Sequence, residues 1–145
     1  MNKGITIFYV DDDQDDLDYL SIVINDINKG VELFTHNSAN DLMHALHNPP
    51  PKPHVVFVDL NMPGTNGFEL VEDLRKSEQH KDLPIVVFST ATDPESIRKS
   101  KNLGANFYLP KSGDYSALRK SIEYVLDIDW QNFIPGNENF IYRYN

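Results

Sequence analysis

The stretch Val55-Val56-Phe57-Val58-Asp59-Leu60-Asn61-Met62-Pro63-Gly64 is the most informative part of this sequence. Its first four residues are apolar, and three of them are β-branched, which predicts a strand buried on both faces of a parallel sheet. Asp59 follows this strand, and Asn, Pro and Gly then predict a loop. In open α/β sheets, ligands bind at the carboxyl ends of the strands. The stretch therefore places a carboxylate where such a protein binds its ligand.

Strand and helix patterns alternate along the rest of the chain. Short runs rich in β-branched and aromatic residues predict four further strands, at 5–10, 31–35, 84–88 and 107–109. Apolar residues at helical spacing and capping residues predict five helices, which follow 11–16, Ser38, Gly67, Asp93 and Gly113. Five strands alternating with five helices predict an α/β fold with a doubly wound parallel sheet in the flavodoxin-like order 2-1-3-4-5.

The composition bounds the class of protein. At 145 residues, with 40% apolar and 24% charged residues, the chain has the length and composition of one globular domain. The net charge of −9 argues against nucleic-acid binding, which draws its affinity from Lys and Arg. Membrane-spanning runs and a secretory leader are not expected, and the absence of Cys excludes disulfides and thiolate metal sites. We therefore expect a cytoplasmic protein.

The last stretch of the chain breaks the alternating pattern. We expect a domain over residues 1–127 and an aromatic C-terminal tail over 128–145, which is too short to form an output domain. A solvated tail is not normally so rich in aromatic residues. The favoured interpretation is that the tail packs back on the domain. The alternative is a contact with a partner or with a second copy of the chain.

Polar side chains follow several of the predicted strands. Asp11 and Asp12 follow the first strand, Asp59 the third, Ser89 the fourth and Lys111 the fifth. Two carboxylates about 4 Å apart repel each other by roughly 4 kcal/mol at an effective dielectric constant near 20. Such a cluster needs a cation or a raised pKa, and oxygen ligands without Cys favour Mg²⁺ or Mn²⁺ over zinc.

A metal beside Asp59 points to phosphoryl chemistry. An aspartate can accept a phosphoryl group as an acyl phosphate, and the transfer mainly requires placement and neutralisation of charge. Lys111 would supply a positive charge, and the Ser89 hydroxyl could donate to a phosphoryl oxygen. Taken singly, each of these residues has an ordinary structural interpretation, as a helix start, a loop residue or a surface lysine. The prediction depends on their shared position at strand ends.

The pattern resembles the receiver domain of bacterial two-component response regulators over roughly residues 3–127. Four motifs support the resemblance, and the second is the most specific: Tyr9-Val10-Asp11-Asp12-Asp13, Val58-Asp59-Leu60-Asn61-Met62-Pro63-Gly64, Leu83 to Thr90, and Gly104 to Lys111. The resemblance implies that Asp59 is the phosphoacceptor and that Lys111 pairs with the phosphoryl group. It also implies that Ser89 holds this group and that Tyr108 is an aromatic switch residue.

The resemblance implies a metal site and partners as well. Mg²⁺ would be bound by Asp12, by Asp11, by Asp59 and by the backbone carbonyl of Asn61. The phosphodonor would be a phosphohistidine on a sensor histidine kinase or a phosphotransfer protein, and the output would be a change of surface read by a downstream protein. Two positions depart from the family pattern. Ser112 stands where a proline usually follows the lysine, so a cis bond is not expected there, and Asp13 adds a third acid beside the pair.

Three other functions fit the fold less well. An aspartyl phosphatase would need a second acid two residues after its nucleophile, where this chain has Asn61. Acids at the switch point would repel the phosphate of a flavodoxin-like cofactor. A phosphate-independent interaction domain on the same fold is the main alternative. The expectation is a response regulator that catalyses only its own phosphorylation and dephosphorylation and is not otherwise an enzyme.

Overall fold

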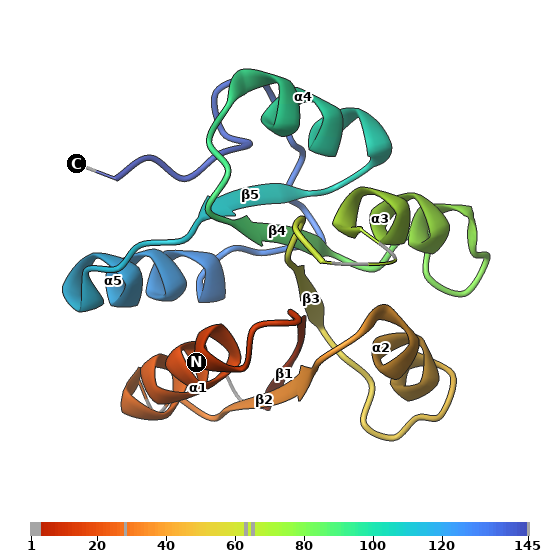
Figure 1. The fold of residues 1–145 in the computed structure, drawn as a ribbon, viewed down its shortest axis with the longest axis horizontal. Helices are drawn as coiled ribbons and strands as arrows, with labels where there is room; N and C mark the ends of the chain where they lie inside the picture. The colour runs from red at the N-terminus through yellow and green to blue at the C-terminus, as the bar shows by residue number, and fades with distance from the viewer. Residues whose placement is uncertain (1–3, 28, 63, 65, 145) are drawn as a thin grey trace.

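A five-stranded sheet lies at the centre of the computed structural model, which describes residues 4–27, 29–62, 64 and 66–144 (Figure 1). All neighbouring strands are parallel and their order is β2-β1-β3-β4-β5, as the sequence predicted. The strands are β1 Ile5–Val10, β2 Val31–His36, β3 Val55–Val58, β4 Ile85–Ser89 and β5 Phe107–Pro110. Asn28, Pro63 and Thr65, which belong to a predicted helix end and a predicted loop, lie outside the described residues.

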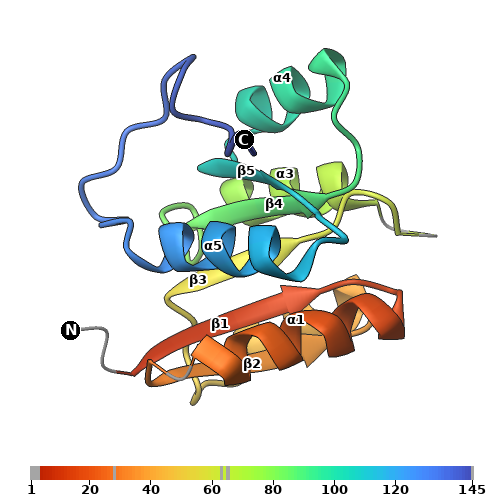
Figure 2. The same cartoon turned by 90° about the vertical axis from the view of Figure 1, so that its left-hand side faces the viewer.

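Five helices alternate with the strands and cover both faces of the sheet. They are α1 Gln14–Ile27, α2 Ala39–Leu46, α3 Gly67–Lys76, α4 Pro94–Leu103 and α5 Tyr115–Leu126. Helices α1 and α5 lie on one face, and α2, α3 and α4 lie on the other (Figures 1 and 2). Ser38 and Asp93 cap α2 and α4 as predicted, because their side chains accept hydrogen bonds from Asp41 N and Ser96 N. No helix of the described residues is long and apolar enough to cross a membrane.

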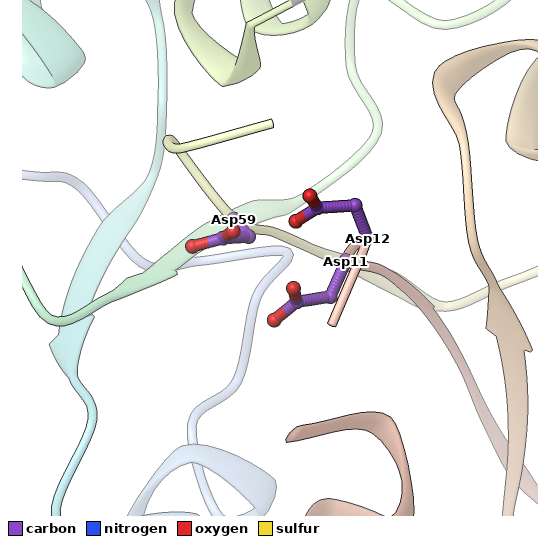
Figure 3. Close-up of side chains that lie close together, drawn as sticks. All are labelled: Asp11, Asp12 and Asp59. Atoms are coloured by element: carbon purple, nitrogen blue, oxygen red, sulfur yellow. The ribbon is translucent and has the colours of Figure 1, made fainter. Parts of the chain in front are cut away.

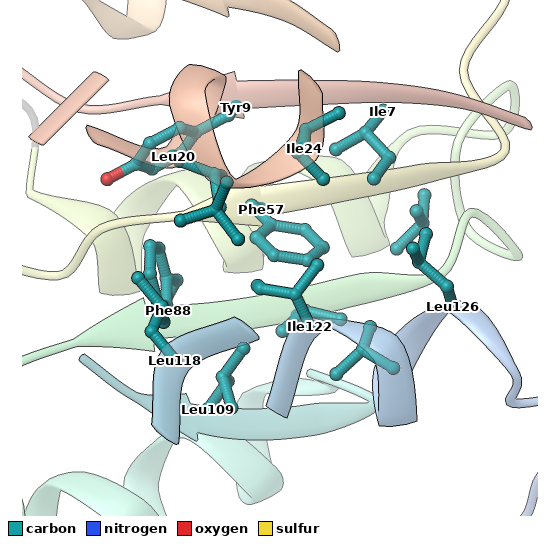
Figure 4. Close-up of a cluster of buried hydrophobic side chains, with 14 of the residues drawn as sticks. Ile7, Tyr9, Leu20, Ile24, Phe57, Phe88, Leu109, Leu118, Ile122 and Leu126 are labelled. Atoms are coloured by element: carbon teal, nitrogen blue, oxygen red, sulfur yellow. The ribbon is translucent and has the colours of Figure 1, made fainter. Parts of the chain in front are cut away.

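Each face of the sheet has its own apolar core. Between the sheet and α1 and α5 lies a cluster that includes Tyr9, Leu20, Phe57, Phe88 and Ile122 (Figure 4). The opposite cluster joins the sheet to α2 and α3, and partly buried residues of α4 pack against it. Strands β3, β4 and β5 are buried along their whole length, which explains their continuous apolar runs.

Three strands extend one residue beyond their sequence patterns. His36, Ser89 and Pro110 end β2, β4 and β5, although none of them continues an apolar run. The backbone pairing continues through them, since Asp11 N donates to His36 O at 3.0 Å and Lys111 N donates to Ser89 O at 2.9 Å. The sheet therefore extends to the first polar residues of the loops.

The aromatic tail packs back on the domain, as the favoured interpretation held. Trp130 and Phe133 lie with their ring centroids 6.3 and 6.0 Å from that of Phe107, and Phe140 is buried in the core beside β5. Ile141 forms a parallel bridge with Tyr108, so the chain after α5 returns along the outer edge of β5 (Figure 2). A contact of the tail with a partner or a second copy remains a prediction.

Candidate functional site

Three carboxylates converge at the carboxyl ends of the two central strands. The register pairs Val10 of β1 with Val58 of β3, so Asp11 and Asp59 leave the sheet side by side. One carboxylate oxygen from each of Asp11, Asp12 and Asp59 lies within 4.8 Å of the other two (Figure 3). These are hard oxygen donors without His or Cys, so the cluster can hold a metal ion of the Mg²⁺ type.

The two acids of the first motif have different environments. Asp11 is fully buried, and one of its carboxylate oxygens accepts hydrogen bonds from Tyr9 Oη at 2.5 Å and Lys111 Nζ at 2.7 Å. Its other oxygen accepts from Asp13 N at 3.0 Å, whereas Asp12 is exposed. The third acid, Asp13, caps the first turn of α1 by accepting from Asp15 N at 2.9 Å. The structure therefore places Asp12, and not Asp13, in the pocket.

Lys111 reaches the site from the end of β5 and binds three carboxylates. Its Nζ lies 2.7 Å from Asp11, 2.8 Å from Asp16 and 3.4 Å from Asp59. Burial alone would lower the pKa of Lys111, but the hydrogen bonds to Asp11 and Asp16 raise it above its ordinary value. The lysine therefore stays charged. The peptide bond between Lys111 and Ser112 is not cis, and the cis peptide bonds of the described residues lie in the proline run 49–51.

Sequence reasoning missed Asp16. It treated the acidic run 11–16 as a helix start plus a metal-binding pair, and did not assign a partner to this residue. Asp16 lies in the first turn of α1, four residues before the buried Leu20. This spacing was the available signal, because residues four apart lie on the same face of a helix.

Asp59 is a buried acid with a raised pKa. Its side chain is 6% exposed, and burial raises its pKa to about 6. Lys111 lowers the pKa, Asp11 raises it, and a hydrogen bond from the backbone N–H of Asn61 lowers it again. Asp59 therefore ionises at neutral pH but keeps a strong preference for a nearby cation. The Asn61 carbonyl stays a predicted ligand.

Ser89 and Tyr108 are linked through the loop after β4. Ser89 is fully buried, and its Oγ accepts from Ala91 N at 3.2 Å. Tyr108 Oη donates to Ala91 O at 2.7 Å, and burial raises the Tyr108 pKa to about 12 although a hydrogen bond with Ser89 lowers it. Both predicted residues therefore contact the same short loop beside the acidic cluster.

Gly67 fixes the loop that follows Asp59. Its N–H donates to Leu60 O at 3.1 Å, and a Cβ at this position would lie 2.3 Å from the backbone oxygen of Asp59. Only glycine allows this close approach of α3 to the end of β3. The glycine after the Asp59 motif therefore sets the position of the carboxylate.

The comparisons with known proteins agree with this geometry. Residues 7–123 match the model of the response regulator receiver domain. The chain belongs to this family. The receiver is 36% identical to the protein PilH of Pseudomonas aeruginosa over 75 residues, which are 52% of this chain and 62% of PilH. It is 32% identical to a chemotaxis protein CheY homolog of Campylobacter jejuni over 72 residues, 50% of this chain and 55% of the homolog.

Solved structures give the same fold. The crystal structure of the chemotaxis protein CheY4 of Vibrio cholerae superposes on the receiver with a TM-score of 0.70 at 30% identity, over 83% of this chain and 98% of CheY4. The Mn²⁺-bound form of the response regulator Rcp1 has a TM-score of 0.74 at 24% identity, over 90% of this chain and 97% of Rcp1, which shows the fold alone. The chain covers less than two thirds of the length of the curated relatives it matches.

Family membership gives the acidic cluster its meaning. The chain is a receiver domain of the CheY-like type used in two-component signalling, and receiver domains are signalling domains, not conventional enzymes. The pocket of Asp11, Asp12 and Asp59 fits an aspartate phosphorylation and Mg²⁺ site.

Proposed function

We propose that this receiver accepts a phosphoryl group on Asp59 from a phosphohistidine of a sensor histidine kinase or phosphotransfer protein, in the cytoplasm. The observation that supports this best is the environment of Asp59. Its buried carboxylate lies close to a second buried acid, Asp11, and both acids contact the ammonium group of Lys111, at 3.4 Å for Asp59 and 2.7 Å for Asp11. The charged form of such a buried carboxylate is stabilised when a cation binds beside it.

The metal proposed for this reaction is Mg²⁺, with Mn²⁺ as a second fit. The exposed Asp12 and the Asp59 carboxylate offer direct ligands, and the Asn61 carbonyl is the third proposed ligand. Asp11 already accepts hydrogen bonds on both oxygens, so it contributes negative charge and is proposed to act through water. When bound, the ion neutralises charge on the phosphoryl oxygens.

The protein residues would act directly on the phosphoryl group. A carboxylate oxygen of Asp59 forms the new bond to phosphorus while the bond from phosphorus to the donor imidazole nitrogen breaks, and that nitrogen keeps the electron pair. Lys111 Nζ, 3.4 Å from Asp59, pairs with one phosphoryl oxygen, and the Ser89 hydroxyl donates to another. Loss of the group to water, catalysed by the same residues, reverses the signal.

The proposed output is a change of surface. When Ser89 turns toward the phosphoryl group, the loop through Ala91 shifts and Tyr108 follows. Helix α4 is a suitable mobile element, because Ser100 is the one fully buried residue among its ten. A downstream protein that prefers one shape then shifts the population by its differential affinity. Residues 1–127 would form the switch, with 128–145 as an added segment, and a homodimer is a further proposal.

Intact mass after incubation with acetyl phosphate tests the function. We expect one added phosphoryl group on the wild type with Mg²⁺, and none without Mg²⁺ or in Asp59→Asn. Asp15→Asn, which changes a nearby exposed acid outside the pocket, should be labelled like the wild type. Labelling of Asp59→Asn would overturn the assignment. If neither acetyl phosphate nor a panel of histidine kinases labels the wild type, the phosphate-independent interaction domain becomes the better interpretation.

A further inference from the structure

The outer edge of β5 is covered by the chain's own tail. Tyr108 N donates to Phe140 O at 2.7 Å, and Tyr142 N donates to Tyr108 O at 2.9 Å. Both outward backbone groups of Tyr108 are therefore paired with the tail, in the manner of a short parallel strand. Figures 1 and 2 show this segment beside β5, on the side of the molecule that also bears α4. We call residues 140–144 the edge segment.

Side chains hold the edge segment at both ends. Phe140 is 2% exposed and lies in the core cluster under α4, where its ring centroid is 6.4 Å from that of Tyr108. At the other end, Tyr144 Oη donates to Pro110 O at 2.7 Å and lies 3.1 Å from Ser121 Oγ. The segment is thus docked by the buried Phe140, by two backbone hydrogen bonds and by the Tyr144 hydroxyl, and the partly buried Ile141 and Tyr142 pack beside them.

The connection to α5 is more loosely held. Residues 131 and 132 are exposed, and Ile134 has 80% of its surface in contact with solvent. Exposed polar contacts within 129–139 hold the turn, such as Asn132 to Asp129 at 2.6 Å. Trp130 and Phe133 of this connection pack beside Phe107, but residues 134–139 bury little apolar surface. The edge segment can therefore leave β5 without unfolding the domain.

Tyr108 connects the edge segment to the phosphorylation site. Its hydroxyl donates to Ala91 O, and Ala91 N donates to Ser89 Oγ. Its backbone binds the edge segment through both available groups. A single residue therefore contacts the loop that Ser89 holds and the strand that covers the sheet edge.

We propose that the edge segment is a displaceable strand, and that a phosphoryl group on Asp59 weakens its docking and opens the edge of β5 to an extended peptide of another protein. This inference rests on the proposed phosphorylation of Asp59. The hydrogen bonds above belong to the unphosphorylated chain. When the Ser89 hydroxyl turns to the phosphoryl group, Ala91 N loses its acceptor, the loop shifts, and the Tyr108 ring that packs against Phe140 shifts with it.

The chemistry of the opened surface specifies the kind of partner. An exposed sheet edge offers a free N–H and C=O, which an extended peptide recognises by adding a strand. The site left by Phe140 would take an aromatic or large aliphatic side chain. The partner segment is therefore expected to resemble the edge segment itself, with an aromatic anchor followed by residues in extended conformation.

Amide hydrogen exchange followed by NMR tests the coupling directly. The Tyr108 and Tyr142 amides are hydrogen-bonded only while the edge segment is docked on β5. The amides of β3 measure the stability of the sheet and serve as the internal control. With Mg²⁺ and beryllofluoride, a phosphoryl analogue, we expect exchange of the two tyrosine amides to rise roughly tenfold, within the range of ordinary coupling energies, while β3 is unchanged. Unchanged exchange in a chain that binds beryllofluoride would overturn the inference but leave the proposed function intact. Failure of the wild type to bind beryllofluoride would overturn both.

The same coupling, measured in the opposite direction, provides a second test. If occupation of the Asp59 site weakens docking, then weakened docking must tighten binding at that site by the same factor. Phe140→Ala should therefore bind beryllofluoride several-fold more tightly than the wild type in the presence of Mg²⁺. Ile134→Ala is the matched control, because this side chain lies in the same tail but in solvent. Equal affinity of Phe140→Ala and the wild type would contradict the coupling.

A peptide of residues 137–144 serves as the probe for the opened edge. By isothermal titration calorimetry we expect it to bind the wild type with Mg²⁺ and beryllofluoride, and to bind Phe140→Ala without them. It should not bind the resting wild type, whose edge is already covered. Equal binding in both states of the wild type, or no binding to any of these proteins, would overturn the edge of β5 as a docking surface.

Discussion

Lys111 is closer to Asp16 than to Asp59: its Nζ lies 2.8 Å from the first carboxylate and 3.4 Å from the second. The lysine that is proposed to meet a phosphoryl group is therefore already paired with an acid from the first turn of α1. Asp16 has 35% of its side chain exposed, so the pair is only partly screened by solvent. Asp16 competes with any anion bound at Asp59 for the same ammonium group.

Replacing Asp16 with Asn should release Lys111 toward the site. We expect Asp16→Asn to bind Mg²⁺ and beryllofluoride about fivefold more tightly than the wild type, since a partly exposed charged hydrogen bond contributes about 1 kcal/mol. Titration followed by NMR measures the affinity. Asp18→Asn makes the same charge change on an exposed residue of α1, whose carboxylate accepts a hydrogen bond from Gln14. If both variants shift the affinity equally, long-range charge explains the effect and the competition does not.

The raised pKa of Asp59 predicts a specific pH dependence of stability without metal. Its pKa is about 6 in the folded chain, against an ordinary value of 3.8, so the folded chain binds this proton more tightly than the unfolded chain. The free energy of unfolding should therefore fall as pH rises from about 4 to about 6, by up to about 3 kcal/mol. Asp59→Asn should lose this slope and be the more stable protein at pH 7.

Urea denaturation in EDTA between pH 4 and pH 8 measures this difference. Asp73→Asn, on the exposed side of α3, controls for the loss of one negative charge. The assignment of the slope to Asp59 requires that Asp73→Asn keep the pH dependence of the wild type. If the free energies of unfolding of the wild type and Asp59→Asn change with pH in parallel, burial does not raise the pKa of Asp59.

Asp12 should matter for metal binding and little for folding. Because it is exposed, Asp12→Asn should change the metal-free stability by no more than about 0.5 kcal/mol. Mg²⁺ at about 100 times its dissociation constant should stabilise the wild type by about 2.7 kcal/mol, and this gain should disappear in the variant. Thermal unfolding with and without Mg²⁺ measures both effects. Asp15→Asn should keep the gain, and an equal loss in both variants would mean nonspecific screening.

Gly67 should not tolerate a side chain. The Cβ of Gly67→Ala would lie 2.3 Å from Asp59 O and 2.7 Å from Leu60 Cα, so the backbone has to move. We expect a loss of about 2–3 kcal/mol of unfolding free energy, together with weaker Mg²⁺ binding, because the Asp59 loop shifts. Gly113→Ala meets no atom within 4 Å and should be nearly neutral. A neutral Gly67→Ala would show that α3 can withdraw from the strand end.

The sequence was sufficient for the sheet order and for the convergence of Asp11, Asp12 and Asp59. The order follows from the doubly wound fold that alternating strands and helices predict, and the convergence follows because parallel strands end at one edge of the sheet. The pairing of Lys111 with Asp16 could not be predicted in this way, because it joins residues 95 apart in the chain. Periodicity gives the face of a helix but not the side chain that approaches it from another loop.

The sequence predicted that the tail packs on the domain, but not where it packs. Its aromatic content indicated burial, but its return along Tyr108 depends on an unpaired sheet edge, which exists only once the sheet has formed. Ser112 shows the opposite case. It departs from the family pattern, yet the register of β4 and β5 ends at Ser89 and Pro110 and delivers Lys111 to the acids.

Trp130 is the single tryptophan of the chain, and it lies in the tail, with its ring centroid 5.4 Å from that of Phe133. The tryptophan fluorescence of this protein therefore originates beside Phe107, at the amino end of β5, and not beside Asp59. Its emission reports on the base of the tail without any label or substitution. A rapid-mixing experiment on the unmodified chain can thus time the tail separately from the chemistry.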